Sequence, residues 1–321
     1  MIERLSSIVT DMRFRTIRAL CSILAIGLAA GCRGGDESGE PIQIDGSSTV
    51  YRISMAAQEA YRKQKPEVLV IVDEHGTGGG FARYLQNEVD IVDASRPAKP
   101  AEESKAKAQG IEWTRFTVGY DGITVVVNPQ NDFVKSLSVQ QLKALWAPDS
   151  KIKTWKDLDS SWPDRKIVFY SPDDDSGTFD FFTEATVGKT GSQRKDVQES
   201  SDDNLLVNGV AGDRDAIGYF GYAYYKANEK RVRSVAIQNG PDAEAIAPSS
   251  ETINNKTYVP LSRPLFIYVK NSALRRRPEV AEFVSFYLAN VKELAEAGGY
   301  VAPTADDRKE NERKLPKPAA K

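Results

Sequence analysis

Three short segments rich in serine, threonine and glycine are the part of this 321-residue chain best suited to bind a ligand. Residues 45–49, 76–80 and 176–178 read DGSST, GTGGG and SGT, and each lies at or just before a stretch with helical spacing. Backbone N–H groups at a helix start, together with hydroxyl groups, donate hydrogen bonds to an anion, and the helix dipole favours its negative charge. Glycine lets the backbone approach a ligand closely. The three segments together predict an anion-binding site.

Each segment also has a simpler interpretation, because a single serine-rich or glycine-rich turn is typical of an ordinary helix N-cap. Residues 76–80 lack the Gly-Lys-Ser ending of a P-loop and the Gly-x-Gly-x-x-Gly spacing of dinucleotide-binding folds. The glycine-rich segment is therefore not expected to bind a nucleotide.

The composition argues against several kinds of chemistry. The chain has one histidine, His75, and two cysteines, which disfavours a histidine-based triad, a multi-histidine metal site, a zinc cluster and a disulfide framework. We expect neither a metal nor a cofactor, and we expect His75 to cap or pack. Because 43 Lys and Arg residues face 45 Asp and Glu residues, there is no overall basic field, and nucleic acid is not an expected partner.

The N-terminus has the pattern of an export signal. Arg13, Arg15 and Arg18 precede an apolar run, residues 19–30, which is too short to span a bilayer but has the length of a signal-peptide core. Small residues then lead to Cys32. This end of the run resembles the lipoprotein box of bacteria, although alanine stands three residues before the cysteine, where leucine is usual.

We expect residues 1–31 to be removed as a lipoprotein signal peptide and Cys32 to carry the lipid. The protein would then be exported and anchored to the membrane of the bacterial cell envelope, in the periplasm or on the outer face of the cell membrane. Residues 32–40 are glycine-rich and charged, which is typical of a tether. Met12 is an alternative start, since residues 12–32 alone make a more usual signal. The alternative interpretation of Cys32 is a buried cysteine that follows a short helix.

Alternating strand and helix patterns in the rest of the chain predict an α/β fold. Short apolar, β-branched runs predict strands at residues 42–45, 68–72, 89–92, 122–127, 166–170, 217–222 and 264–269. Helical spacing predicts helices at residues 48–61, 81–87, 179–185 and from 278, and a capping box at 138–141 predicts another. The charged last twenty residues are predicted to form a surface tail.

Five motifs in this order resemble the phosphate-binding proteins of bacterial phosphate ABC transporters. They are GSSTV at residues 46–50, GTGGGF at 76–81, ASRP at 94–97, DSGTF at 175–179 and AIGYFGY at 216–222. The resemblance implies a two-lobed periplasmic-binding-protein fold, type II-like, with a two-strand hinge and an inter-lobe cleft that closes over one dehydrated phosphate. It also implies high-affinity binding of inorganic phosphate, delivery to ABC transporter permease subunits, and no enzymatic activity.

The resemblance further implies which residues bind phosphate. The positions of the family's ligands fall on Ser48, Thr49, Val50, Thr77, Gly78, Ser176, Gly177 and Thr178. Two positions depart from the best-known members, since Arg96 stands in place of an aspartate and Pro172 in place of an arginine. We therefore expect Ser95 and Arg96, at a strand end, to bind phosphate as well. Arg96 would supply the positive charge, as in a shorter branch of the family with the same Ser-Arg-Pro sequence. The alternative for Arg96 is a surface residue in a turn.

A buried carboxylate is expected to separate phosphate from sulfate, because phosphate keeps a proton near neutral pH and sulfate does not. The acids nearest to the anion-binding segments are Asp45, before the first, and Asp175, before the third. Either one is a candidate proton acceptor, and Asp175 is also a candidate phosphate ligand. Each could instead interact with a helix dipole or orient Arg96.

The expected lobes are formed by residues 41–125 with 242–321 and by residues 126–241, so that two strands cross between them. Two alternatives keep the same anion site. One is a phosphate sensor or adhesin-like surface lipoprotein that serves no permease. The other is a phosphoryl-transfer enzyme, for which the chain supplies little in the way of a metal cluster or an activated nucleophile.

Overall fold

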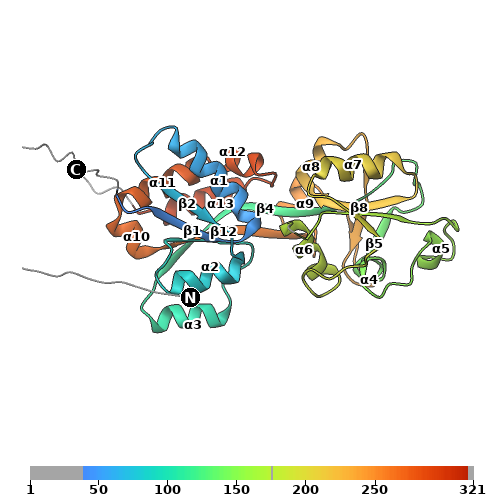
Figure 1. The fold of residues 1–321 in the computed structure, drawn as a ribbon, viewed down its shortest axis with the longest axis horizontal. Helices are drawn as coiled ribbons and strands as arrows, with labels where there is room; N and C mark the ends of the chain where they lie inside the picture. The colour runs from blue at the N-terminus through green and yellow to red at the C-terminus, as the bar shows by residue number, and fades with distance from the viewer. Residues whose placement is uncertain (1–38, 175, 317–321) are drawn as a thin grey trace, which may run out of the picture. The chain divides into compact units, whose positions relative to one another are not determined.

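The computed structural model of the protein describes residues 39–174 and 176–316, drawn as a coloured ribbon in Figure 1. The predicted signal peptide, the lipidation site Cys32, most of the tether and Asp175 lie outside these residues. In the described part of the chain, no helix has both the length and the apolar composition needed to cross a membrane.

Nine strands of the described residues form one sheet, which begins with three parallel strands. β1 (Ile42–Gly46) lies between β2 (Val70–Asp73) and β3 (Ile91–Ala94). Two long antiparallel strands, β4 (Trp113–Val127) and β12 (Ser262–Lys270), continue the sheet from β3. Figure 1 shows β4 and β12 running side by side from the first lobe to the second.

The second lobe continues the sheet beyond β4. Its strands are β8 (Ala216–Gly221), β6 (Val168–Ser171), β7 (Val197–Glu199) and β9 (Arg233–Ser234). β8 is antiparallel to β4, β6 is parallel to β8 and to β7, and β9 pairs with β4. A small separate sheet contains β5 (Ser136–Ser138), β10 (Ala236–Gln238) and β11 (Ala245–Ile246).

Helices cover the sheet in both lobes (Figure 1). Those of the first lobe are α1 (Ser48–Arg62), α2 (Gly76–Leu85), α3 (Pro100–Ala108), α10 (Asn271–Arg276), α11 (Pro278–Ala289), α12 (Val291–Ala297) and α13 (Ala305–Lys314). Those of the second lobe are α4 (Val139–Trp146), α5 (Trp155–Leu158), α6 (Gly177–Thr186), α7 (Asp203–Gly212), α8 (Tyr222–Ala227) and α9 (Ser250–Asn254). Helices α1, α2 and α6 each follow the carboxyl end of a parallel strand, which is where α/β sheets bind ligands.

Local sequence explains several of these elements. The predicted capping box of α4 is confirmed, because the Ser138 hydroxyl accepts a hydrogen bond from Gln141 N at 3.1 Å and Gln141 Oε1 accepts one from Ser138 N at 2.9 Å. The predicted helix from residue 278 is also confirmed. Its residues at helical spacing, among them Val280, Phe283 and Tyr287, are fully buried.

Two large apolar clusters form the cores of the lobes. The first includes Ile44 and Phe283, and the second includes Trp146, Phe182 and Tyr219. In the second core the rings of Phe182 and Tyr219 stack with their centroids 3.6 Å apart. Strand β4 contributes side chains to both cores, which makes it part of each lobe.

The second core also contains Ile253, Tyr258 and Leu261, which come from α9 and the segment before β12. The sequence-based division placed residues 242–321 in the first lobe. The residue limits of the lobes stay a prediction, and this packing favours a boundary near the start of β12.

The predicted surface tail is wrong for residues 305–314, which form α13. Thr304 caps this helix by accepting a hydrogen bond from Asp307 N at 3.0 Å. Asn311 is buried and forms two hydrogen bonds to the backbone of β4, one to Thr117 N at 3.1 Å and one to Thr117 O at 2.8 Å. This polar attachment replaces an apolar face, so hydrophobic periodicity does not reveal the helix.

Two further elements start earlier than predicted. Strand β4 begins at Trp113 rather than at residue 122. The first half of the strand pairs with β12, but it mixes polar and apolar residues and so lacks the continuous apolar run on which the prediction relied. Helix α2 begins at Gly76 rather than at residue 81. Glycine disfavours a helix by about 1 kcal/mol per residue, and tertiary packing overrides that preference here.

Candidate functional site

The starts of α1, α2 and α6 meet at one cavity of about 620 Å³. We call residues 46–49, 76–78 and 176–178 the first, second and third anion turns. The cavity is lined by Ser47, Ser48, Thr49, Gly76, Thr77, Gly78, Ser95, Arg96, Pro97, Lys99, Gly177, Asp180, Phe181, Glu184, Thr190, Arg263 and Pro264. A second cavity of about 230 Å³ adjoins the first and third turns and is lined in part by Ser176 and Thr178.

The predicted site residues fall into three groups. Seven of them line the larger cavity, and they are Ser48, Thr49, Thr77, Gly78, Ser95, Arg96 and Gly177. Ser176 and Thr178 line the adjoining one. The Val50 side chain is fully buried in the first core, so only its backbone is suited to contact a ligand.

The first anion turn is fixed against the end of β3. Ser47 N donates a hydrogen bond to Asp93 O at 2.9 Å. Gly46 has a φ of +147°, and a Cβ at this position would lie 2.0 Å from Asp93 O. Only glycine fits this close approach of two strand ends.

The second anion turn is also joined to the end of β3. Ser95 N donates a hydrogen bond to the Thr77 hydroxyl at 3.2 Å, and the hydroxyl groups of Thr77 and Ser95 are 3.3 Å apart. The two hydroxyls predicted to bind the anion therefore lie together on the cavity wall.

The third anion turn meets the first turn directly. The Ser176 hydroxyl accepts a hydrogen bond from Thr178 N at 3.3 Å and so caps α6. A Cβ on Gly177 would lie 2.7 Å from the Thr49 hydroxyl and 2.9 Å from the Ser48 hydroxyl. Glycine is thus what lets the two lobes bring these turns into contact.

Arg263 on β12 is the site residue that the sequence analysis missed. Its Nη2 donates hydrogen bonds to the Thr49 hydroxyl at 2.9 Å and to Gly177 O at 3.3 Å, which joins the first and third anion turns. The guanidinium lies 4.0 Å from the centre of the Phe181 ring, and 16% of the side chain is exposed. A cation therefore lies where the two turns meet.

Strand register and a buried acid place Arg263. Asp121 on β4 is its partner in the β4–β12 ladder, and Asp121 Oδ2 accepts hydrogen bonds from both Nε and Nη2 at 3.2 Å. Burial raises the pKa of the Asp121 carboxyl, and the adjacent Arg263 acts in the opposite direction. One sequence signal was available, because Ser262, Arg263 and Pro264 repeat the Ser-Arg-Pro triplet that begins at Ser95.

Arg96 lines the cavity, but its guanidinium is already paired. Nη1 and Nη2 donate to the two carboxylate oxygens of Glu102 at 2.9 and 2.8 Å, and Nη1 also donates to Pro97 O at 3.0 Å. A bidentate ion pair of this kind holds an arginine strongly. Arg263, which contacts two anion turns, is therefore the better placed cation of the two.

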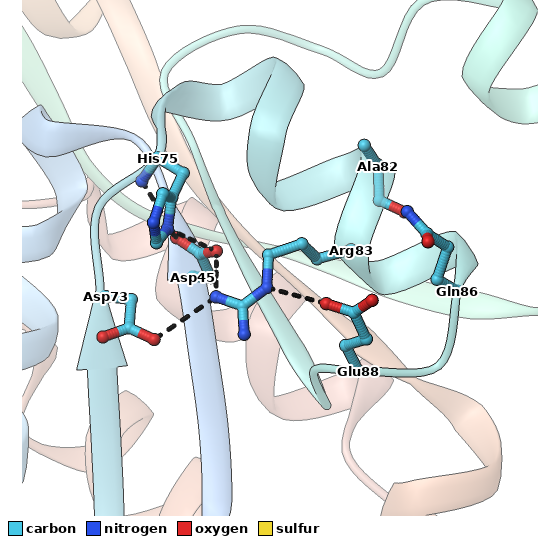
Figure 2. Close-up of polar contacts among 7 residues, drawn as sticks. All are labelled: Asp45, Asp73, His75, Ala82, Arg83, Gln86 and Glu88. Carbon is cyan, nitrogen blue, oxygen red and sulfur yellow. Dashed lines mark hydrogen bonds and ion pairs between the residues drawn. The ribbon is translucent and has the colours of Figure 1, made fainter.

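Asp45 is fully buried and does not line either cavity of the anion turns. Its carboxylate accepts hydrogen bonds from Arg83 Nη1 at 2.7 Å and from His75 N at 3.0 Å, as Figure 2 shows. Burial opposes the charged form, but these hydrogen bonds outweigh burial and lower the pKa of Asp45. Both interactions leave Asp45 poorly suited to accept a proton from a ligand.

Asp180 is an acid that does line the larger cavity. It lies in the first turn of α6. Burial of part of its side chain raises the pKa of Asp180, and the nearby Arg263 opposes this shift. The candidate site thus combines neutral donors, one bridging cation and the carboxyl groups of Asp180 and Glu184.

Comparison with known proteins now identifies the family. The sequence matches the PBP superfamily domain over residues 32–291. It is 41% identical over 282 residues to protein SphX of Synechocystis sp., covering 87% of this chain and 83% of that one. It is 38% identical over 288 residues to the phosphate-binding protein PstS of Staphylococcus aureus, covering 88% of this chain and 86% of that one. The chain belongs to the PstS and SphX family of the PBP superfamily.

Solved structures similar to this PBP superfamily member agree with that assignment. A possible phosphate binding protein from Planctomyces limnophilus has a TM-score of 0.82 and 41% identity, covering 86% of this chain and 98% of that one. An ABC-type phosphate transport receptor from Vibrio cholerae has a TM-score of 0.65 and 25% identity, covering 82% of this chain and 100% of that one. The predicted two-lobed periplasmic-binding-protein fold is confirmed.

Proposed function

We propose that this protein binds inorganic phosphate at the three anion turns and delivers it to the permease of an ABC transporter. The observation that carries the proposal is that three helix starts meet at one cavity, where Arg263 bridges Thr49 and Gly177. Relatives named as phosphate-binding proteins and as a phosphate transport receptor support it. These names describe receptors and not enzymes, and we assign the site no catalytic step.

The proposed phosphate ligands are mostly neutral hydrogen-bond donors. They are Ser48, Thr49, the backbone of Val50, Thr77, Gly78, Ser95, Ser176, Gly177 and Thr178. Arg263 supplies the fixed positive charge and Arg96 a second one at the cavity wall. A buried oxyanion is held best by many such donors and about one cation, because an excess of charge would itself require compensation.

We propose Asp180 as the acid that accepts the proton of phosphate, because it lines the cavity beside Arg263. Asp45 is occupied by Arg83 and His75. Asp175 stays a predicted acceptor and ligand that lies outside the described residues.

Calorimetry of the purified protein tests both proposals. The wild type is expected to bind one phosphate and to bind sulfate at least about 100-fold more weakly, since sulfate leaves the acceptor facing a second negative charge. In Asp180→Asn, the ratio of the phosphate affinity to the sulfate affinity is expected to fall about tenfold or more. Asp242→Asn, an exposed acid away from the cavity, is the control. Absence of phosphate binding by the wild type would contradict the proposed function, and an unchanged preference in Asp180→Asn would contradict the role of that residue.

We infer from the sequence that the protein is exported and anchored by lipid on Cys32. The support is the arginine-flanked apolar run and the small residues that precede this cysteine.

Expression of Cys32→Ala in a bacterium tests the anchor. The variant is expected to stay unprocessed or to lack lipid, because no other cysteine follows the signal. Labelling with radioactive palmitate should mark the wild type and not this variant. Ser38→Ala in the same region is the control and should be labelled like the wild type. A Cys32→Ala protein that still takes up the label would show that the lipid is attached elsewhere.

A further inference from the structure

We propose that Asp45 and Arg83 are positioning residues that hold the first and second anion turns at the spacing phosphate requires. Neither side chain lines the cavity, so neither belongs to the proposed phosphate contacts. The inference rests on the proposed function and extends it to residues behind the site.

One carboxylate connects the residues that precede the two turns. Asp45 comes directly before Gly46 of the first turn, and His75 comes directly before Gly76 of the second. Asp45 Oδ1 accepts a hydrogen bond from His75 N at 3.0 Å, and His75 Nδ1 lies 3.0 and 3.1 Å from the two carboxylate oxygens. Figure 2 shows the His75 ring against the carboxylate, which lies between it and the Arg83 guanidinium.

Arg83 connects the same carboxylate to the body of α2. Its Nη1 donates to Asp45 Oδ2 at 2.7 Å and to Asp73 Oδ2 at 3.3 Å, and its Nε donates to Glu88 Oε2 at 3.0 Å. The Nη1 and Nε atoms of the guanidinium are thereby fixed (Figure 2). Arginine suits this role because its planar fork binds several oxygens at once.

A steric contact acts together with the polar one. A Cβ on Gly80 would lie 2.6 Å from Asp45 O and 2.6 Å from Gly46 Cα, so α2 packs directly against the end of β1. Because no space separates them, a shift of α2 moves the second turn relative to the first. The fully buried carboxylate of Asp45 limits this movement of α2, because it is hydrogen-bonded to His75, which directly precedes the second turn, and to Arg83.

The same lobe contains a matched ion pair away from the turns. Asp90 accepts two hydrogen bonds from Arg277 Nη1, at 3.0 and 2.9 Å, and one from Gln43 N at 3.1 Å. It lies just before β3, at the opposite end of that strand from Ser95. Asp90→Asn therefore disturbs a similar network in the same sheet without touching an anion turn.

The test compares Asp45→Asn with Asp90→Asn in the full-length protein. Asp45→Asn is expected to weaken phosphate binding about 10- to 100-fold, since small misplacement of binding groups has effects of that size. Asp90→Asn is expected to change binding less than threefold. Arg83→Gln, which keeps the backbone bond of His75, is a second variant in case the first does not fold, and it should also weaken binding.

Two further readouts separate positioning from general stability. In a double-mutant cycle of phosphate binding, Asp45→Asn and Thr77→Ala should be non-additive, whereas Asp90→Asn and Thr77→Ala should be additive. In the ligand-free protein, amide hydrogen exchange at residues 46–49 and 76–78 should increase in Asp45→Asn and not in Asp90→Asn.

The proposal would be overturned by additive effects of Asp45→Asn and Thr77→Ala, or by unchanged exchange at both turns. Hydrogen exchange needs no ligand, so it still tests positioning if the wild type fails to bind phosphate. That failure would count against the proposed function alone.

Discussion

Arg263→Met is expected to bind phosphate about 30- to 4,000-fold more weakly than the wild type. Truncating one partner of a buried, hydrogen-bonded charge pair at a binding site costs about 2–5 kcal/mol, and each 1.4 kcal/mol is a factor of ten in affinity. Arg263 joins the first and third anion turns, so the variant also loses the link between Thr49 and Gly177. Isothermal calorimetry measures the loss directly.

The partner of Arg263 needs its own control, because the variant leaves Asp121 buried without its ion-pair partner. The double variant Arg263→Met with Asp121→Asn removes that buried charge and should recover stability without recovering phosphate affinity. Arg165 is a matched arginine in the second lobe. It donates to Asp215 at 2.8 Å and lies 5.5 Å from the Phe133 ring centre, away from the cavity. Arg165→Met should bind phosphate like the wild type.

The same titration decides between the two arginines of the cavity. Arg96 is paired with Glu102 and contacts no anion turn through a hydrogen bond in the described residues. Arg96→Met is therefore expected to have a smaller effect than Arg263→Met. A larger loss of phosphate affinity in Arg96→Met than in Arg263→Met would show that Arg96 supplies the main positive charge, as the sequence analysis predicted.

The anion turns could be predicted from sequence because their chemistry is local. Each is a run of small and hydroxyl residues at the end of a strand and the start of a helix, and both features are visible within a few residues. The capping box at Ser138 was predictable for the same reason. The order of five such motifs was enough to indicate the family and its fold.

Arg263 was missed because its role depends on distant residues. It reaches the site only through the register of β12 against β4, which pairs it with Asp121. Strand register between segments so far apart is set by packing and is not visible in either segment alone. The contacts of Asp45 could not be predicted for the same reason, since its partner Arg83 lies on a neighbouring helix.

Another buried acid, Asp93, gives the last prediction. It lies in the buried strand β3 behind the first anion turn and is itself fully buried. Its Oδ1 accepts a hydrogen bond from the Ser54 hydroxyl at 2.9 Å, while Oδ2 has no hydrogen-bond partner among the described residues. Burial raises the pKa of Asp93 to about 8, far above the value of 3.8 for a free aspartate.

This shift makes the stability of the protein depend on pH. In the folded state Asp93 keeps its proton up to about pH 8, whereas in the unfolded state it loses the proton near pH 4. The neutral acid therefore contributes its full stability below about pH 4, and this contribution is lost as the pH rises to about 8. The slope is about 1.4 kcal/mol of unfolding free energy per pH unit.

Asp93→Asn should remove this dependence, because the amide has nearly the same shape and cannot lose a proton. Urea unfolding at pH 5, 6, 7 and 8 is expected to show that the wild type loses about 1.4 kcal/mol per pH unit relative to the variant. Other titrating groups are common to both proteins and cancel in the difference. Asp90→Asn, at an acid of the same sheet that is paired with Arg277, is the matched control. If the pH curves of Asp93→Asn and the wild type are parallel, Asp93 is charged in the folded protein and must have a partner other than Ser54.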